Sequence, residues 1–169
     1  MEAIECILSR RSIRQYSNQP IARETIDTLL KAAMAAPSAG NEQPWEFIVI
    51  TDRKILDEIP KKHPYAQMAD QAPLGIFVCG NQQYEKYEGY WVQDLSAATQ
   101  NILLSAHAIG LGGVWVGIYP RDHRESAFRT LLNLPEHIIP LSLVLLGYPA
   151  EQKPPAERYN SQRVHYNQW

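Results

Sequence analysis

Residues 89–118, GYWVQDLSAATQNILLSAHAIGLGGVWVGI, contain the longest helical pattern of the chain, followed directly by a strand pattern. Apolar residues between Gly89 and Ile109 recur at helical spacing and cover more than one narrow stripe. A helix that is apolar on most sides is buried on most sides, so we expect it inside a core or a dimer interface. Glycines then end the helix, and Val114–Ile118 predicts a strand.

Helical and strand patterns alternate along the rest of the chain. We predict helices at Ala3–Ser9, Arg23–Ala35, Arg53–Ile59, near Tyr65–Gln71 and at Arg124–Leu132, and strands at Glu46–Thr51, Ile76–Cys79 and Leu141–Tyr148. The segment Pro37–Asn41 predicts a loop. Alternation of this kind predicts an α/β or α+β fold with a sheet covered on both faces.

The composition is that of one soluble globular domain. The 169 residues are 45% hydrophobic and 20% charged, which is enough chain to bury a sizeable core. No apolar run approaches the roughly 20 residues that span a bilayer, and the acidic start is unlike a signal peptide, so no membrane role is expected. The net charge of −2 argues against a nucleic-acid partner. Cys6 and Cys79 lack metal-ligand or CxxC spacing, which favours buried thiols and a cytoplasmic location.

Cations are concentrated at Arg10–Arg14, with the sequence RRSIR. Guanidinium groups present fork-shaped donors that match phosphate oxygens, and the Ser12 hydroxyl adds another donor. The cluster therefore indicates an anion site, with the phosphate of a small ligand as the favoured occupant. The alternative is an ordinary solvated basic turn.

The segment after Tyr148 has a different character. It contains Pro149, Pro154 and Pro155, has little apolar periodicity, and ends in the aromatic sequence VHYNQW. Such a segment cannot form a core of its own. We expect its aromatic residues to dock on the body or on a neighbouring subunit, with a frayed terminus as the alternative.

Catalytic signatures are absent from the sequence: it has no GxGxxG, P-loop, GxSxG or HExxH motif. His107 lies on the long apolar helix and is expected to be a core histidine rather than a ligand. Asp94, on the same helix, is expected to have a structural hydrogen-bonding role. An anion site without an acid–base constellation suggests that a bound cofactor supplies the reactivity.

Three segments, in order and spacing, are similar to the nitroreductase family of FMN enzymes. They are Arg10–Arg14, then Ala35–Trp45 (AAPSAGNEQPW), and then Gly110–Gly117 (GLGGVWVG), and the similarity extends from about residue 3 to the aromatic terminus. The resemblance implies an α+β fold with a mixed, mostly antiparallel central sheet and helices on both faces. It also implies one FMN-binding domain over residues 1–169, a homodimer with FMN at the interface, and residues 149–169 as an arm reaching the partner.

The resemblance assigns the N-terminal cluster to the cofactor. Arg10 and Ser12 would bind the FMN phosphate, and Arg11 would help through its backbone or its side chain. Arg14 would reach the O2/N1 edge of the isoalloxazine, where a cation stabilises negative charge on reduction and raises the reduction potential.

The other two motifs would complete the site. Pro37, Ser38 and Ala39 resemble the loop that the partner subunit contributes to the flavin. Asn41 has two interpretations, a cofactor contact or an Asx-type turn.

Towards the end of the chain, Gly117 matches the position whose backbone N–H points at flavin N5, and Val116 would line the ring; glycine permits such a close approach. Arg158 matches a basic residue that also reaches the phosphate, and is preferred over Arg163 for this role. No side chain is assigned a catalytic role, and no metal site is expected.

The implied activity is hydride transfer from NADH or NADPH through the flavin to an electron-poor acceptor, such as a nitroaromatic or a quinone, in a ping-pong cycle. The chain is shorter than well-known members, which carry extra mid-chain helices around the substrate pocket. Here Tyr84, Tyr87, Tyr90 and Trp91 fall in that region, and they either cover the flavin or pack the start of the long helix. Alternative functions are an FMN-dependent reductive dehalogenase, a flavin-degrading relative, or a non-catalytic anion-binding module.

Overall fold

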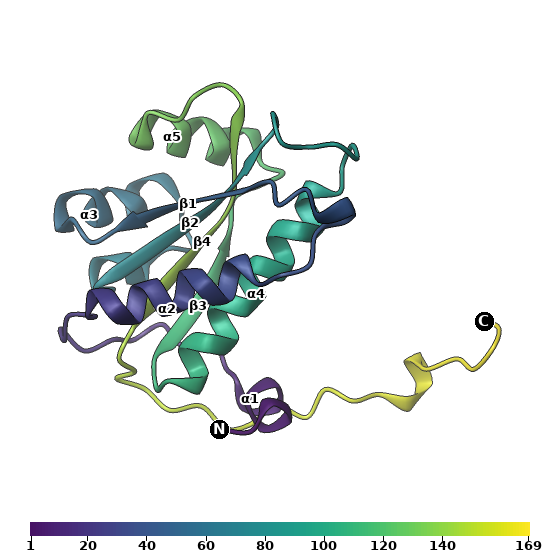
Figure 1. Ribbon diagram of the computed structural model, residues 1–169. Coiled ribbons are helices and arrows are strands. Elements are labelled where there is room, and N and C mark those ends of the chain that lie inside the picture. Colours follow the sequence, from purple (N-terminus) through teal and green to yellow (C-terminus); the bar gives the residue numbers. More distant parts are fainter.

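A four-stranded sheet runs through the middle of the computed structural model, which describes residues 1–169 (Figure 1). The strands are β1 (Trp45–Ile50), β2 (Leu74–Asn81), β3 (Gly112–Gly117) and β4 (Ile138–Gly147). Their order across the sheet is β1-β2-β4-β3, and every neighbouring pair is antiparallel. Because β2 and β4 lie at the centre and are covered on both faces, their sequences are apolar almost without interruption.

The predicted α+β class with a mostly antiparallel sheet is confirmed, but the sheet is not mixed. Parallel pairing is limited to one isolated bridge between Ser12 and Gly113, where the Ile13 N–H donates to the Gly113 carbonyl at 3.1 Å. The bridge stays isolated, and the Arg14 N–H that follows it donates to the Glu151 carboxylate.

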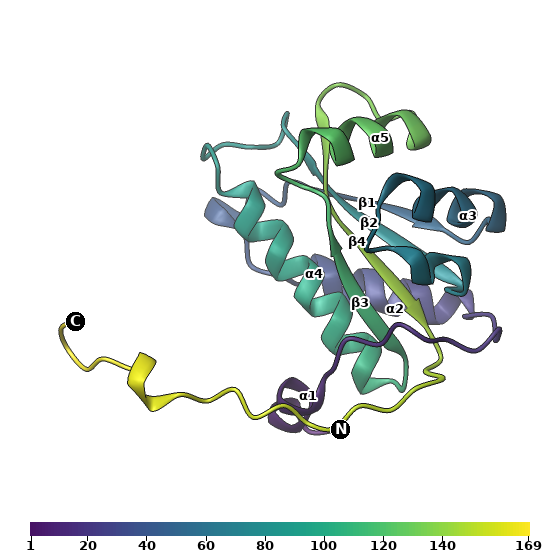
Figure 2. The ribbon, with the colours of Figure 1, turned by 180° about the vertical axis from the view of Figure 1, so that it is seen from behind.

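Helices cover both faces of the sheet (Figures 1 and 2). On one face, α2 (Arg23–Met34) and α4 (Trp91–Ala108) form a core with β2 and β4. On the other face, α3 (Arg53–Lys62) and α5 (Asp122–Leu132) pack against alternate residues of the same strands. The expectation of a sheet covered on both faces is therefore correct.

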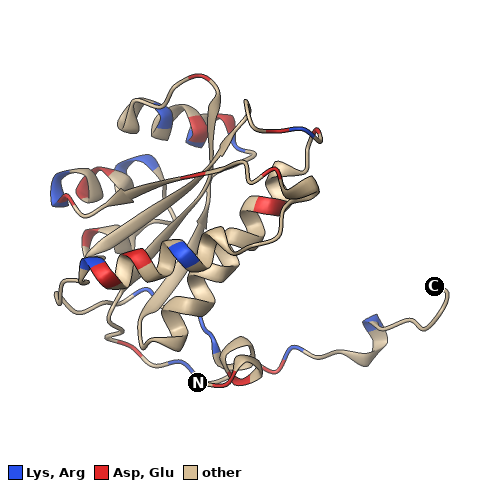
Figure 3. Cartoon of the chain, in the orientation of Figure 1, with Lys and Arg blue, Asp and Glu red and all other residues tan.

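The long apolar helix is buried on most sides, as its sequence predicts. The buried residues of α4 include Leu95, Ala98, Ile102 and Ala106, which lie in the core with α2 and the sheet. Figure 3 shows α4 free of charge along most of its length, with a single acidic position, Asp94, near its start. Burial of this helix fixes the place of the residues that precede it and of the strand that follows it.

The bounds of α2, α4 and α5 differ from the predicted ones by one or two residues, and two other predicted helices differ more. The helix α3 continues past Ile59 to Lys62, because Pro60 in its last turn only removes one backbone donor while the turn stays packed on the core. The helix expected near Tyr65–Gln71 is a short 3-10 helix at Gln67–Asp70, with Pro73 soon after it.

The two terminal segments run side by side along the edge of β3 (Figure 2). The Ser17 N–H donates to the Tyr148 carbonyl, and the Ala150 N–H donates to the Gln15 carbonyl, each at 2.9 Å. Farther along, Lys153 Nζ donates to the Ser12 carbonyl at 2.9 Å. These contacts hold the arginine cluster against the body of the protein.

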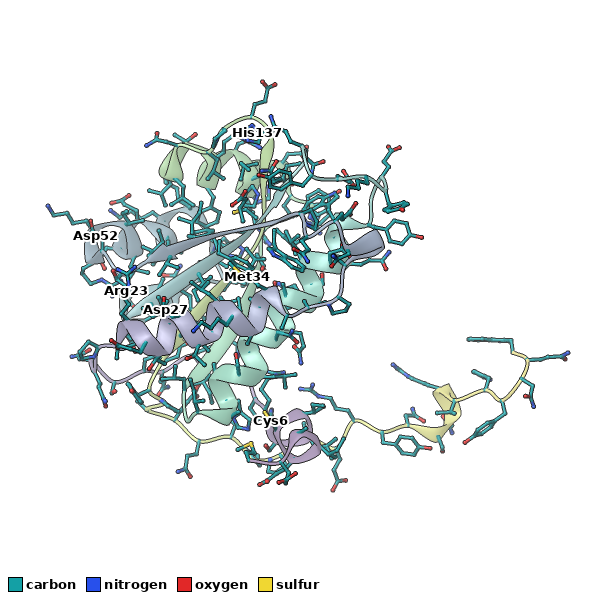
Figure 4. All side chains as sticks on the ribbon, in the orientation of Figure 1. Cys6, Arg23, Asp27, Met34, Asp52 and His137 are labelled. Carbon is teal, nitrogen blue, oxygen red and sulfur yellow. The ribbon has the colours of Figure 1, made fainter.

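The helix α1 (Ala3–Ser9) and the C-terminal arm both expose apolar residues. In α1 only Cys6 is buried, and its thiol donates to the Leu104 carbonyl at 3.2 Å. Most of the arm after residue 154 extends away from the body and is exposed (Figure 4), although Arg158 lies near enough to Arg10 for its charge to lower the pKa of Arg10. The aromatic residues Tyr159, Tyr166 and Trp169 are exposed and therefore do not dock on their own chain, and their docking on a second subunit stays a prediction. None of the helices combines the length and the apolar character needed to cross a membrane.

Candidate functional site

Arg10 is a partly buried cation without an anionic partner. Its Nη1 atom is buried and makes no hydrogen bond, and the residue forms no ion pair. Burial, followed by the nearby charges of Arg158 and Arg11, lowers the pKa of Arg10. An arginine stays charged in proteins, so a site that gathers three such cations and leaves a buried donor free fits a multiply charged anion such as a phosphate.

The adjacent cavity, of 600 Å³, opens beside this cluster. Arg11 lines it, and its guanidinium donates to the Pro154 carbonyl. Other lining residues come from α1, from the end of α4 and from the terminal segment, and they include Ser9, His107, Glu151 and Lys153. Ser12 lies next to this cavity, where its carbonyl is held by Lys153 and its backbone pairs with Gly113.

His107 lies in this cavity rather than in the core, contrary to the expectation. Its Nε2 lies 2.8 Å from the Ser9 hydroxyl. Burial and the charge of Arg10 lower the pKa of His107, against the opposite effect of Glu5. Because α4 ends at Ala108, the last turn of the helix emerges from the core, which places this histidine at the surface.

A second cavity, of 460 Å³, brings Arg14 together with the end of β3. Val116 and Gly117 line it, as does Trp115 from the exposed side of the strand. The Arg14 N–H donates to Glu151 Oε1 at 2.6 Å, so the backbone is fixed while the side chain is exposed. Arg11 and Arg14 thus line different cavities, because an extended segment turns residues an odd number of positions apart to opposite sides.

Gly117 borders open space in this second cavity. A Cβ atom built on it would meet nothing within 4 Å, so the protein itself does not require glycine there. Its carbonyl accepts hydrogen bonds from His63 Nε2 at 2.9 Å and from Arg124 Nη1 at 3.0 Å. A flat ring can therefore approach the main chain at a position whose peptide group is firmly oriented. The cationic cluster and this open space together fit a phosphate-bearing flavin.

Sequence reasoning missed His63 and Arg124. His63 is buried, its Nδ1 accepts the Tyr65 N–H at 3.2 Å, and Arg124 lies over the Tyr65 ring at 5.8 Å. Burial lowers the pKa of His63, and this effect is larger than the rise in pKa caused by the hydrogen bond to Gly117. The positive charge of Arg124 lowers the pKa further. No spacing pattern marks these residues, because they meet through the packing of α3 and α5 on one face of the sheet.

Pro37, Ser38 and Ala39 of the loop Pro37–Asn41 line a third cavity, of 270 Å³, at the start of α4. The Ser38 hydroxyl accepts the Gln43 N–H at 3.0 Å, and the Ala39 N–H donates to Asp94 Oδ1 at 3.0 Å. Asp94 thus has the structural role that the sequence suggests. The cavity shares no lining residue with the cavity of Arg14 and Gly117. Within one chain the structure does not bring the loop to the other predicted site residues.

Asn41 takes part in the turn of this loop. It adopts a left-handed conformation with φ of 55°, and its Oδ1 accepts from Gln43 Nε2 at 2.8 Å. Asparagine is favoured in such a turn because its side chain hydrogen-bonds locally. These contacts support the turn interpretation, and a cofactor contact by Asn41 stays a prediction.

The aromatic residues before α4 divide into two kinds. Trp91 is buried and packs edge-on against Tyr119, with ring centroids 4.9 Å apart. Tyr84, Tyr87 and Tyr90 are half exposed, so they remain available for contacts outside the chain. No cluster of three or more metal-ligating side chains is found.

Comparison with known proteins gives a consistent result. The model of the nitroreductase family matches residues 7–148. A protein of Methanothermobacter thermautotrophicus, provisionally named NADH dehydrogenase/NAD(P)H nitroreductase, is 47% identical over 169 residues, covering 100% of this chain and 88% of that protein. A Parabacteroides distasonis crystal structure with the same provisional name has a TM-score of 0.95 at 43% identity, covering 99% of this chain and 98% of that one.

A third relative carries the cofactor. The structure of a provisionally assigned nitroreductase of Desulfovibrio desulfuricans in complex with FMN has a TM-score of 0.87 at 28% identity. It covers 100% of this chain and 98% of that chain.

Proposed function

The chain belongs to the nitroreductase family and is an FMN-dependent NAD(P)H oxidoreductase, and from this premise we propose which of its residues hold the cofactor and what it reduces. Arg10, Ser12 and Arg158 bind the FMN phosphate, with help from Arg11. Arg14, Val116 and Gly117 contact the isoalloxazine. The acceptor is an electron-poor ring compound, a nitroaromatic or a quinone.

The buried, unpartnered guanidinium of Arg10 carries this proposal. Burial, and then the positive charges of Arg158 and Arg11, lower its pKa, and Arg10 forms no ion pair within the chain. A phosphate monoester supplies up to two negative charges and several acceptor oxygens.

When bound, FMN supplies the redox chemistry: hydride from NADH or NADPH is accepted at N5 and later passed to the acceptor, which binds where the nicotinamide was bound before. Arg14 contributes a positive charge that stabilises the negative charge gained by the ring on reduction. Gly117 leaves room for the ring, while His63 and Arg124 hold its peptide group in place. His63 uses its Nε2–H on the Gly117 carbonyl, so we assign proton supply to solvent.

A homodimer completes the proposed site. Exposed apolar residues on α1 and on the arm support a second subunit, since such residues rarely gather on a monomer surface. They are Ile4, Ile7 and Leu8 on the helix, and Tyr159, Tyr166 and Trp169 on the arm. In this arrangement residues 1–169 form one FMN-binding domain, of which residues 149–169 are an arm that extends onto the partner. The loop Pro37–Ala39 then contacts the flavin of the other subunit.

We also propose a cytoplasmic location. Cys6 and Cys79 are free, buried thiols, which is usual in a reducing compartment. Burial raises the pKa of the Cys79 thiol to about 12, so this thiol is unreactive. The comparisons favour neither a dehalogenase or flavin-degrading activity nor a non-catalytic anion-binding module.

The substitution Arg10→Ala tests the phosphate site. Loss of a charge-assisted hydrogen bond weakens FMN binding by about 1.5–3 kcal/mol, measured by titrating the cofactor-free protein with FMN and following flavin fluorescence. Riboflavin, which lacks the phosphate, should bind the unsubstituted protein and the variant equally. The matched control is Arg23→Ala on α2, an exposed arginine labelled in Figure 4. An unchanged FMN affinity in Arg10→Ala would place the phosphate elsewhere.

The acceptor class needs a separate measurement. Anaerobic titration with NADH and NADPH should bleach the flavin absorbance, and addition of a nitroaromatic or a quinone should restore it. Reoxidation by neither compound would show that the proposed acceptor class is wrong.

A further inference from the structure

Two buried carboxyl groups lie close enough to interact where three segments of the chain come together. Glu42 follows the loop Pro37–Asn41, and Asp94 lies in the first turn of α4. The third segment, residues 82–90, joins β2 to α4. Glu42 is 7% exposed and Asp94 is 5% exposed, so both groups are removed from water.

Each carboxyl group uses one oxygen to hold a neighbouring segment. Glu42 Oε2 accepts the Lys86 N–H at 2.6 Å and the Tyr87 N–H at 3.1 Å. Asp94 Oδ1 accepts the Ala39 N–H at 3.0 Å. The other oxygens, Glu42 Oε1 and Asp94 Oδ2, are buried and have no hydrogen-bond partner.

No cation compensates this pair. Neither residue forms an ion pair, and the further charged group that acts on Asp94 is also an acid, Glu85 of the joining segment. Two ionised carboxylates in contact and away from water repel strongly. Burial raises the pKa of Asp94, and this effect is larger than the lowering caused by the hydrogen bond from the Ala39 N–H. Glu42 and Glu85 raise the pKa further.

We propose that Glu42 and Asp94 share one proton between Oε1 and Oδ2, and that this shared proton locks the loop Pro37–Gln43 to the joining segment and to α4. A single proton turns two unpartnered acceptors into a donor and an acceptor, as in other carboxyl pairs that share a site. Resting on the proposed function, the pair positions Pro37–Ala39 for the cofactor, so Glu42 and Asp94 are positioning residues.

The lock also determines where the exposed tyrosines lie. Gly40 has φ of 51°, and a Cβ atom built on it would lie 2.3 Å from the Tyr87 ring, so the ring packs directly on the glycine. The rings of Tyr87 and Tyr90 pack edge-on, with their centroids 6.5 Å apart. Loss of the shared proton therefore loosens the loop and the tyrosines together.

Amide substitutions test the shared proton. In Asp94→Asn the amide oxygen still accepts the Ala39 N–H, and the amide nitrogen donates to Glu42. In Glu42→Gln the new amide nitrogen donates to Asp94 instead. Each single variant should therefore keep the lock. The double variant places two NH₂ groups against each other, so it should lose far more thermal stability than the two single changes combined.

The pH dependence gives a second measurement, made on the cofactor-free protein. The raised pKa of Asp94 means that the folded state holds a proton that the unfolded state has lost. The stability that this proton contributes is fully present below the pKa of Asp94 in the unfolded chain, about 4. It is lost as the pH rises through the pKa of Asp94 in the folded protein. The melting temperature should fall over that range in the unsubstituted protein and in the exposed control Glu88→Gln, and less in Asp94→Asn.

Infrared spectroscopy provides a direct readout. The band of a protonated carboxyl group should persist above the pH at which free carboxyls ionise, and should disappear in Asp94→Asn. Its absence from the unsubstituted protein, or a double variant as stable as the single ones, would overturn the shared proton.

FMN titration separates this inference from the proposed function. The double variant should bind FMN about tenfold or more weakly, the scale of one lost buried hydrogen bond. If the melting and infrared results hold but FMN affinity is unchanged, the shared proton stands and its role in positioning the cofactor loop is overturned. If the unsubstituted protein binds no FMN at all, the proposed function fails while the melting and infrared tests still decide the shared proton.

Discussion

His63 Nε2 lies 2.9 Å from the carbonyl oxygen of Gly117 and donates a hydrogen bond to it. This contact joins the residue after α3 to the end of β3, which are far apart in the sequence. Arg124 donates to the same oxygen from α5 at 3.0 Å. The peptide group next to the open space at Gly117 is thus held from two elements that pack on the same face of the sheet.

Gly117→Ala tests whether that open space belongs to the cofactor. Because an added Cβ meets nothing within 4 Å, the melting temperature of the cofactor-free protein should stay the same. FMN affinity and the rate of flavin reduction by NADH should both fall, since the methyl group occupies the proposed approach to the ring. Gly75→Ala in β2 is a useful contrast. Its Cβ would lie 3.2 Å from Leu143, so it should lower the melting temperature. Unchanged FMN binding in Gly117→Ala would move the ring away from β3.

Arg14→Ala should lower the reduction potential of the bound flavin while weakening FMN binding only modestly. The side chain is exposed, so its charge acts on the ring through partly screened electrostatics. A spectroscopic redox titration under nitrogen measures the potential. Arg14→Lys keeps the positive charge, so the reduction potential should stay close to that of the unsubstituted protein. This variant separates the effect of the charge from the effect of the side-chain shape. A potential that is the same in Arg14→Ala would place this residue away from the ring.

His63 should make stability depend on pH in the mildly acidic range. Burial lowers its pKa in the folded state, so the unfolded chain takes up a proton first as pH falls below about 6.5. Stability is then complete above the unfolded pKa and is lost as pH falls towards the folded pKa. In His63→Gln, the amide can still donate to Gly117, and the slope of melting temperature against pH should be smaller. His137→Gln, at a residue labelled in Figure 4, serves as the control and should follow the unsubstituted protein. Equal slopes in all three proteins would contradict the buried neutral histidine.

Deletion of residues 159–169 should weaken the dimer without unfolding the chain. These residues are exposed and extend from the body, so the helical circular-dichroism signal of the remaining chain should be preserved. Sedimentation equilibrium should show a higher dimer dissociation constant, because the aromatic contacts of the arm are lost. The single change Trp169→Ala should give a smaller effect in the same direction. A truncated protein that dimerises as tightly as the full chain would exclude the arm from the interface.

Local patterns identified the elements and the family, because each depends on neighbouring residues. The 3.6-residue period of α4 and the apolar run of β4 follow from burial on several sides, and both elements are found, although β4 begins at Ile138, three residues before the predicted start. The bounds of α3 and the 3-10 helix at Gln67–Asp70 were less predictable, because tertiary packing decides where a weak helical pattern ends.

The sequence by itself determined the fold class, the arginine cluster and the likeness to an FMN-binding family. Only the tertiary structure separated Arg11 from Arg14 into different cavities, and only it brought His63 and Arg124 to Gly117. The same holds for the pairing of Glu42 with Asp94, whose burial no periodicity reveals. The physical reason is that charge and hydrogen bonding in a site depend on which surfaces a sheet and its helices press together, and that is a property of the packed chain.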